Sequence, residues 1–227
     1  MKIQLSEERR YLKKVMNKIH LSVDRSFSLD GLPMDDVATF ALISNGETAG
    51  IFNLNSVGAI EVLKRLKPNQ FSDIVAFTAL YRPEPIERGI LDSFINRKHG
   101  LEPVESILPE MNDILNETFS VLVYHEQVEG LMHFLTGILI SQTNALKQTI
   151  EVYKLAAFRK SSDILNVQWN IRKLKPIFDF VVEFAPFTYS RFLAAEHALL
   201  SYQGAYLKAH FPLEFVSSIA PQSKHRA

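Results

Sequence analysis

Apolar residues recur at helical spacing along most of the chain. After Ser6, a residue type that often caps helices, Leu12, Val15, Met16 and Ile19 lie three or four positions apart and predict a first helix. The same spacing, bounded by Ser, Asp, Asn, Gly and Pro residues, predicts shorter helices over residues 36–45, 56–66, 72–81 and 89–96. Beyond residue 125 it predicts long helices over 126–140, 143–158, 163–184, 191–210 and 212–219.

Two short segments have the composition of strands. Residues 121–124 combine apolar and β-branched side chains in a short run, which favours a strand. Residues 50–54 alternate and fit either a brief strand or an extended link. We therefore expect a mainly α, multi-helical chain with a few short strands, changing near residue 120 from mixed short elements to long helices.

Composition narrows the class of protein. Hydrophobic residues make up 47% and charged residues 22%, which is typical of a folded domain. The chain has no cysteine, which excludes disulfides, thiolate zinc sites and cysteine nucleophiles. The N-terminal segment turns polar too early for a signal peptide, and the most apolar stretch, 131–140, is too short to span a membrane. We expect a cytoplasmic protein with no membrane partner.

The formal net charge is +0, so any binding of nucleic acid must rely on local basic patches. Residues 147–175 contain seven basic and two acidic side chains, and smaller basic groups lie at 64–67 and 97–99. Each patch fits either phosphate binding or an ordinary solvated helix face. Neither a phosphate-binding glycine loop nor metal-ligand spacing occurs, so no cofactor or metal is expected.

Several motifs carry more information than these patches. Residues 48–54 (TAGIFNL) and 63–68 (LKRLKP) resemble the segment TTGVFQLES…LLRRLKP of the bacterial DNA polymerase III alpha subunit. Four further stretches, in the family's order, are similar to its ALYRPGP, MVDDFINRKHG, YQEQVM and SYQTAWLKAHYPAEF. Here they read ALYRPEP (79–85), LDSFINRKHG (91–100), YHEQV (124–128) and SYQGAYLKAHFPLEF (201–215). The resemblance covers residues 34–220, nearly the whole chain.

The resemblance implies a helical fingers domain that folds over the primer terminus and the incoming nucleotide. It divides the chain into a remnant of the palm's end (1–36), a fingers-like subdomain of mixed short elements (37–120), a long-helix subdomain (121–220) and a tail (221–227). In this family three palm aspartates, in the motifs PDxDxDF and FDFLGL, hold the two Mg²⁺ ions of catalysis. Neither motif occurs here, so we expect no catalytic residue and no polymerisation by this chain alone.

The resemblance also suggests residues that contact DNA. Lys64, Arg65, Arg82, Arg97 and Lys98 stand in matched motifs and are candidates for contacts with the backbone of primer–template DNA. Such contacts carry no base information, so the expected binding is independent of sequence. It is sensitive to salt because phosphate contacts release counterions, and it is weak because the chain has no net positive charge.

The nucleotide site of the family is only partly present. Lys147 and Arg191 keep positive charge where the resemblance places the triphosphate, whereas Gln148 replaces an arginine and Glu151 adds an anion. The leading hypothesis is a fingers-like module that binds DNA weakly or assembles with other polymerase subunits or a separate palm-bearing chain. A protein-interaction module that no longer binds DNA, and a fragment of an active DNA-directed DNA polymerase, are the alternatives.

Overall fold

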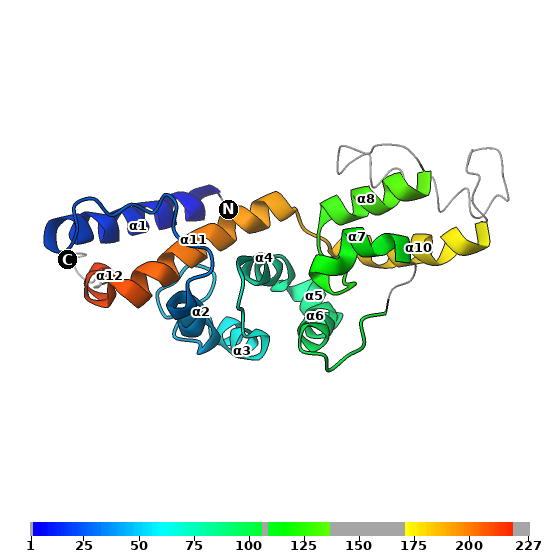
Figure 1. Ribbon diagram of the computed structural model, residues 1–227, viewed down its shortest axis with the longest axis horizontal. Helices are drawn as coiled ribbons and strands as arrows, with labels where there is room; N and C mark the ends of the chain where they lie inside the picture. Colours follow the sequence, from blue (N-terminus) through cyan, green and yellow to red (C-terminus); the bar gives the residue numbers. More distant parts are fainter. Residues whose placement is uncertain (1, 106–108, 137–170, 220–227) are drawn as a thin grey trace, which may run out of the picture. The chain divides into compact units, whose positions relative to one another are not determined.

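The computed structural model describes residues 2–105, 109–136 and 171–219, and Figure 1 shows their helices. This part of the chain is helical and contains no sheet, which confirms the mainly α class. The elements in chain order are α1 (Lys2–Ser22), α2 (Val37–Ser44), α3 (Val57–Leu66), α4 (Phe71–Leu80), α5 (Pro83–Glu87), α6 (Ile90–Lys98), η1 (Pro109–Met111), α7 (Asn112–Leu115), η2 (Asn116–Thr118), α8 (His125–Thr136), α10 (Ile171–Phe184), η3 (Ala185–Phe187), α11 (Arg191–His210) and α12 (Pro212–Ile219).

The chain divides into two compact units. The first combines the described parts of Met1–Thr78 and Phe192–Ala227, and the second is formed by the described part of Ala79–Arg191. These units have other boundaries than the four segments expected from the family resemblance, because the units reflect compactness and the segments reflect matched motifs. Those segments stay predictions.

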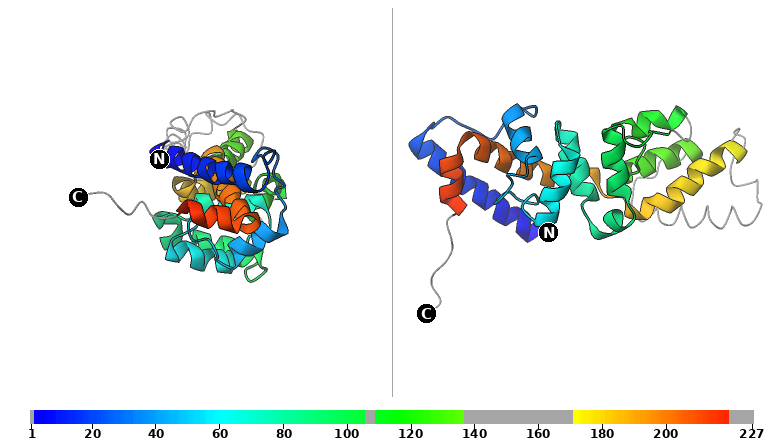
Figure 2. Two further views of the ribbon diagram at one scale, coloured as in Figure 1. Left: turned by 90° about the vertical axis from the view of Figure 1, so that its left-hand side faces the viewer. Right: turned by 90° about the horizontal axis from the view of Figure 1, so that it is seen from below.

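The first unit is built around α11, which is buried along much of its length. Helix α1 turns the apolar face formed by Leu12, Val15 and Ile19 inward. Helix α12 packs against α1, where the rings of Tyr11 and Phe215 meet edge to face with centroids 5.7 Å apart. Figure 2 shows these two helices, from opposite ends of the described sequence, lying together.

Motif residues of α11 hold the segment that precedes α3. The hydroxyl of Ser201 donates to the carbonyl of Phe52 at 2.9 Å. The ammonium of Lys208 donates to the carbonyls of Glu47 at 2.7 Å and Ala49 at 2.9 Å. Two separate matched motifs therefore meet in the fold.

Residues 50–54 form consecutive turns, which excludes the strand expected as one alternative. The N–H of Ile51 donates to Thr48, and the N–H of Leu54 donates to Ile51. Asn53 has a left-handed φ of 58°, which a strand does not accommodate.

The second unit has its apolar core between α8 and α10. Val128 and Leu131 of α8 and Ile177 and Val181 of α10 are fully buried in one cluster. Helix α10 continues through Pro176 without ending there.

The short strand expected over residues 121–124 does not form. The segment is buried, but among the described residues its only β pairing is an isolated parallel bridge between Tyr124 and Tyr189. The carboxamide of Gln127 accepts the N–H groups of Val123 and Tyr124, both at 2.9 Å. A side chain thus satisfies donors that a neighbouring strand would otherwise take.

Most helix limits agree with expectation, and α11 and α12 have the bounds predicted from the sequence. Two helices begin earlier than expected: α1 at Lys2, before Ser6, and α4 at Phe71, one residue before the predicted start at residue 72. The helix predicted over 143–158 lies outside the described residues. No helix of the described part is long and apolar enough to cross a membrane.

Candidate nucleic-acid interface

Lys64 and Arg65 lie in the last turn of α3, where cations interact favourably with the helix dipole. Both residues are exposed, as is Lys67, which ends the helix with a left-handed φ of 46°. The stem of Lys64 lies close to Gly46, since a Cβ built on that glycine would come within 2.7 Å of the lysine Cε. The fold thus presents these cations on the surface of the first unit, as a phosphate contact requires.

Arg82 is partly buried in the second unit, where its side chain binds backbone carbonyls. Its Nε donates to the carbonyl of Ala79 at 2.7 Å, and its Nη2 donates to that of Phe187 at 2.5 Å. The guanidinium also lies over the ring of Tyr189, 5.0 Å from the centroid. Burial lowers the pKa of Arg82 from its ordinary value. These contacts leave less of this side chain available to a phosphate than its motif suggests.

Arg97 is likewise committed to internal contacts. In the last turn of α6 its Nε pairs with Glu102 at 2.7 Å, and its Nη1 donates to the carbonyls of Phe119 and Ser120 at 3.4 and 3.2 Å. The side chain therefore ties α6 to a loop further along the chain. Lys98 follows at the end of the same helix and is partly exposed.

Arg191, the residue expected at the nucleotide, begins α11 next to two carboxylates. Its Nη2 pairs with Glu117 at 2.8 Å, and its backbone N–H donates to both oxygens of Glu126 at 3.0 Å. The guanidinium lies over the ring of Tyr124 at 5.5 Å. Lys147, the second expected nucleotide contact, lies outside the described residues.

The structure brings together only some of the expected residues. Arg82 and Arg191 border the bridge between Tyr124 and Tyr189, each over one of its rings. A third arginine, Arg88, lies over the ring of Phe187. We call these six residues the arginine–aromatic cluster: Arg82, Arg88, Arg191, Tyr124, Phe187 and Tyr189. Lys64 and Arg65 belong to the other unit.

The cluster holds charge but no metal-binding group. Across the described ranges, no three His, Asp or Glu side chains come together in a way that could hold a metal ion. Phosphoryl transfer by this family needs clustered carboxylates for its ions. The three arginines of the cluster can attract an anion, and each lies over an aromatic ring.

Helix α1 has a positive face that was not among the expected basic patches. Arg10, Lys13 and Lys14 are exposed there, whereas Leu12 and Val15 between them are buried. The helical spacing already separates these two faces, so the same pattern that predicted the helix could have revealed the basic surface.

Comparison with known proteins identifies the family. Residues 9–167 match the family described as bacterial DNA polymerase III alpha subunit finger domain. The DNA polymerase III subunit alpha of Aquifex aeolicus (strain VF5) is 36% identical over 213 residues, which are 92% of this chain and 18% of that protein. That of Bacillus subtilis (strain 168) is 32% identical over 213 residues, 92% of this chain and 19% of the relative. The chain thus spans about a fifth of the length of these relatives. It belongs to the bacterial DNA polymerase III alpha subunit finger domain family.

Proposed function

We propose that this chain serves as the fingers part of a DNA-replicating polymerase of the DNA polymerase III alpha type, and that it binds the backbone of primer–template DNA weakly and without sequence preference. The match to the finger-domain family over residues 9–167 carries the proposal. Lys64 and Arg65 support it, because they stand in a matched motif and are exposed at the end of α3.

Catalysis belongs to another part of the polymerase, in the same chain or in a partner. The described residues offer no carboxylate cluster for metal ions, and the sequence contains neither palm motif. We expect no primer extension by this chain with Mg²⁺ and all four deoxynucleotides. Extension by the pure protein that is absent from a mock preparation would overturn this part of the proposal.

Fluorescence anisotropy with labelled primer–template DNA tests the binding. We expect binding at low salt that is lost near physiological salt, because each phosphate contact releases counterions. Arg65→Ala should weaken binding of all DNA sequences alike and reduce the salt slope by about one. Lys64→Ala should do the same.

Arg25→Ala is the matched control, because it removes the same group from another exposed position of the first unit. Equal losses for Arg25→Ala and Arg65→Ala would mean that DNA responds only to total charge. No binding by the wild type at low salt would favour the protein-interaction alternative.

Nucleotide binding by this chain is expected to be much weaker than that of a complete polymerase. Glu117, paired with Arg191 at 2.8 Å, competes with a triphosphate for the arginine's positive charge. Glu117→Gln should therefore strengthen binding of dATP, measured by titration calorimetry, whereas Glu84→Gln, at another exposed carboxylate, should not. Micromolar binding of dATP by the wild type would contradict the expectation that the nucleotide site is only partly present.

A further inference from the structure

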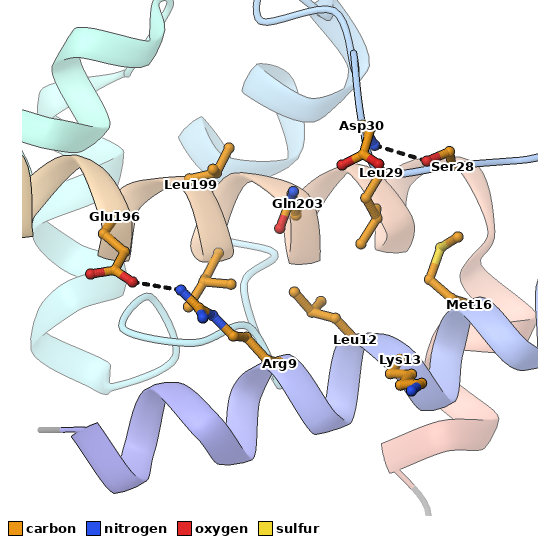
Figure 3. A pocket seen from close by; sticks show the side chains of 11 residues that line it. Arg9, Leu12, Lys13, Met16, Ser28, Leu29, Asp30, Glu196, Leu199 and Gln203 are labelled. Carbon is orange, nitrogen blue, oxygen red and sulfur yellow. Dashed lines mark hydrogen bonds and ion pairs between the residues drawn. The ribbon is translucent and has the colours of Figure 1, made fainter.

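Helix α1 turns a row of cations away from the body of the first unit. Residues 9–22 of this helix include five Lys or Arg side chains and no Asp or Glu. Side chains three or four positions apart share one face of a helix. The exposed side chains with this spacing are Arg10, Lys13, Lys14 and Asn17. We call the three charged ones the α1 cations. Leu12, on the opposite face, lies between α1 and α11 in Figure 3.

The α1 cations are not neutralised by the fold. Within the part of the chain that the structure describes, none of them makes an ion pair or a side-chain hydrogen bond. Arg9 beside them differs, because it pairs with Glu196 at 2.5 Å (Figure 3). Two exposed carboxylates lie nearby: Glu7 on the preceding turn, and Asp30, which lines the same hollow as Lys13. They lower the local positive charge without pairing with it, so the face keeps an excess of cations.

The composition of this face suits phosphates better than a protein or a membrane. Protein interfaces have an apolar or aromatic core in which lysine is depleted. Here Leu12 and Val15, which stand between the cations in sequence, are buried on the other side of the helix. A basic amphipathic helix binds an anionic membrane by inserting its apolar face. In α1 that face is packed inside the first unit and is not available.

The same face favours double-stranded over single-stranded DNA. Tyr11 is the only Phe, Tyr or Trp of residues 9–22, and its ring is half-buried against Phe215. The bases of a single strand would therefore find no ring on which to stack. A duplex offers more phosphate charge per length than a single strand does.

We propose that the α1 cations form a second DNA-binding surface, which holds the phosphate backbone of a duplex without reading its sequence. Arg10 and Lys14 are about 6 Å apart along the helix axis, which matches the rise of about two phosphates of one strand. Figure 1 and the left view of Figure 2 show α1 and α3 on opposite sides of α11. The surface is thus separate from Lys64 and Arg65. It rests on the proposed function in taking DNA as its ligand, but it uses other residues.

Fluorescence anisotropy of a short labelled duplex, titrated with the full chain over a range of salt concentrations, tests the surface. The variant that removes all three charges combines Arg10→Gln, Lys13→Gln and Lys14→Gln. It should bind the duplex more weakly and reduce the salt slope by about three, one for each phosphate contact. A salt slope equal to that of the wild type would overturn the inference, as would the absence of duplex binding by the wild type at low salt.

A second triple variant separates this inference from the proposed function. Lys64→Gln, Arg65→Gln and Lys67→Gln together also remove three charges from exposed positions of the first unit. If only this variant loses affinity, the α1 surface is wrong and the proposed contacts at α3 stand. If only the α1 variant loses affinity, the α1 surface stands and the contacts at α3 are wrong.

Adding a cation to the face should have the opposite effect. Asn17→Lys should strengthen duplex binding and raise the salt slope by about one, because it supplies a fourth cation at the same helical spacing. Asn116→Lys is the matched control, since it makes the same exchange at an exposed position of the second unit. Equal gains for both would mean that DNA responds only to total charge and would overturn the site. Circular dichroism checks that each variant stays helical.

Two other ligands give distinct results. A single strand of the same length should bind more weakly than the duplex; tighter binding that is lost in the α1 triple variant would overturn the preference for a duplex. A labelled polyglutamate might compete through charge alone, so it is compared with a duplex that carries the same number of negative charges. Tighter binding of polyglutamate, lost in the same variant, would replace DNA with an acidic protein and overturn the proposal.

Discussion

Gln127 illustrates how a motif residue of this family can serve the fold. Its carboxamide oxygen accepts two backbone N–H groups at 2.9 Å, and its nitrogen donates to the Thr118 hydroxyl at 2.7 Å and the Ile114 carbonyl at 3.2 Å. The side chain is 4% exposed, so no water replaces these partners easily. The network joins the start of α8 to the turns before it.

Gln127→Leu should therefore lower the free energy of unfolding by about 2–4 kcal/mol, because it leaves buried donors without partners. Urea denaturation followed by circular dichroism measures the change. Gln70→Leu, at an exposed side chain, should stay within about 0.5 kcal/mol of the wild type. A loss at Gln127 no larger than at Gln70 would mean that the network contributes little.

Arg97 allows a structural role to be separated from a phosphate contact. Arg97→Lys keeps the positive charge but loses the planar group that reaches Glu102 and two carbonyls at once. If the role is structural, the variant should lose about 1–2 kcal/mol of stability and keep its DNA affinity.

Arg97→Ala together with Lys98→Ala then has two readouts. Stability should fall for the reason just given, and any additional loss of DNA affinity reports the phosphate contact expected from the motif. Full stability of Arg97→Lys would contradict the internal role. DNA anisotropy and thermal unfolding, measured on the same samples, separate the two effects.

At the scale of the element, α1 has a partly buried carboxylate in line with its buried apolar face. Glu8 precedes Leu12, Val15 and Ile19 at helical spacing, and its Oε1 is buried without a hydrogen-bond partner among the described residues. Burial raises the pKa of Glu8 to about 7, from an ordinary value of 4.5. The neutral acid thus fits the packed helix better than the carboxylate does.

The direction of the pH effect follows from this raised pKa. The folded state binds the Glu8 proton more tightly than the unfolded chain, so the stability contribution is complete below pH 4.5 and is lost as the pH rises to about 7. Glu8→Gln should stabilise the protein above pH 7 by about 1–2 kcal/mol and have little effect near pH 4.5. Glu7→Gln, on the exposed side, is the control. A gain for Glu8→Gln that does not vary with pH would contradict the assignment.

The sequence predicted the helices better than it predicted the surroundings of the candidate DNA- and nucleotide-binding arginines. The limits of α11 and α12 followed from apolar spacing and from Pro212, because helix periodicity and proline act through neighbouring residues. The pairs of Arg97 and Arg191 with glutamates, and their contacts with distant carbonyls and rings, depend on which segments meet in space. No spacing along the chain reveals that, so both arginines looked more available than they are.

At the scale of the whole molecule, equal numbers of opposite charges shape how it meets DNA. The chain has 25 basic and 25 acidic residues, so it exerts little long-range attraction. We expect stopped-flow association with primer–template DNA to proceed at about 10⁵–10⁷ M⁻¹s⁻¹ with little dependence on salt. The salt dependence of affinity should appear in the dissociation rate. An association rate that falls steeply with salt would instead indicate steering by a charged face such as that of α1.

The contact between α1 and α12 has a consequence for the order of events on the ribosome. The face of α1 that carries Leu12, Val15 and Ile19 is made early, but its partners on α11 and α12 are translated after every residue of the second unit. Until then the nascent chain exposes an apolar helix face, of the kind that chaperones hold. The closing step joins segments far apart in sequence, which makes it slow relative to local helix formation. The second unit is thus free to fold first during synthesis, and the first unit is completed only when α11 and α12 have been translated.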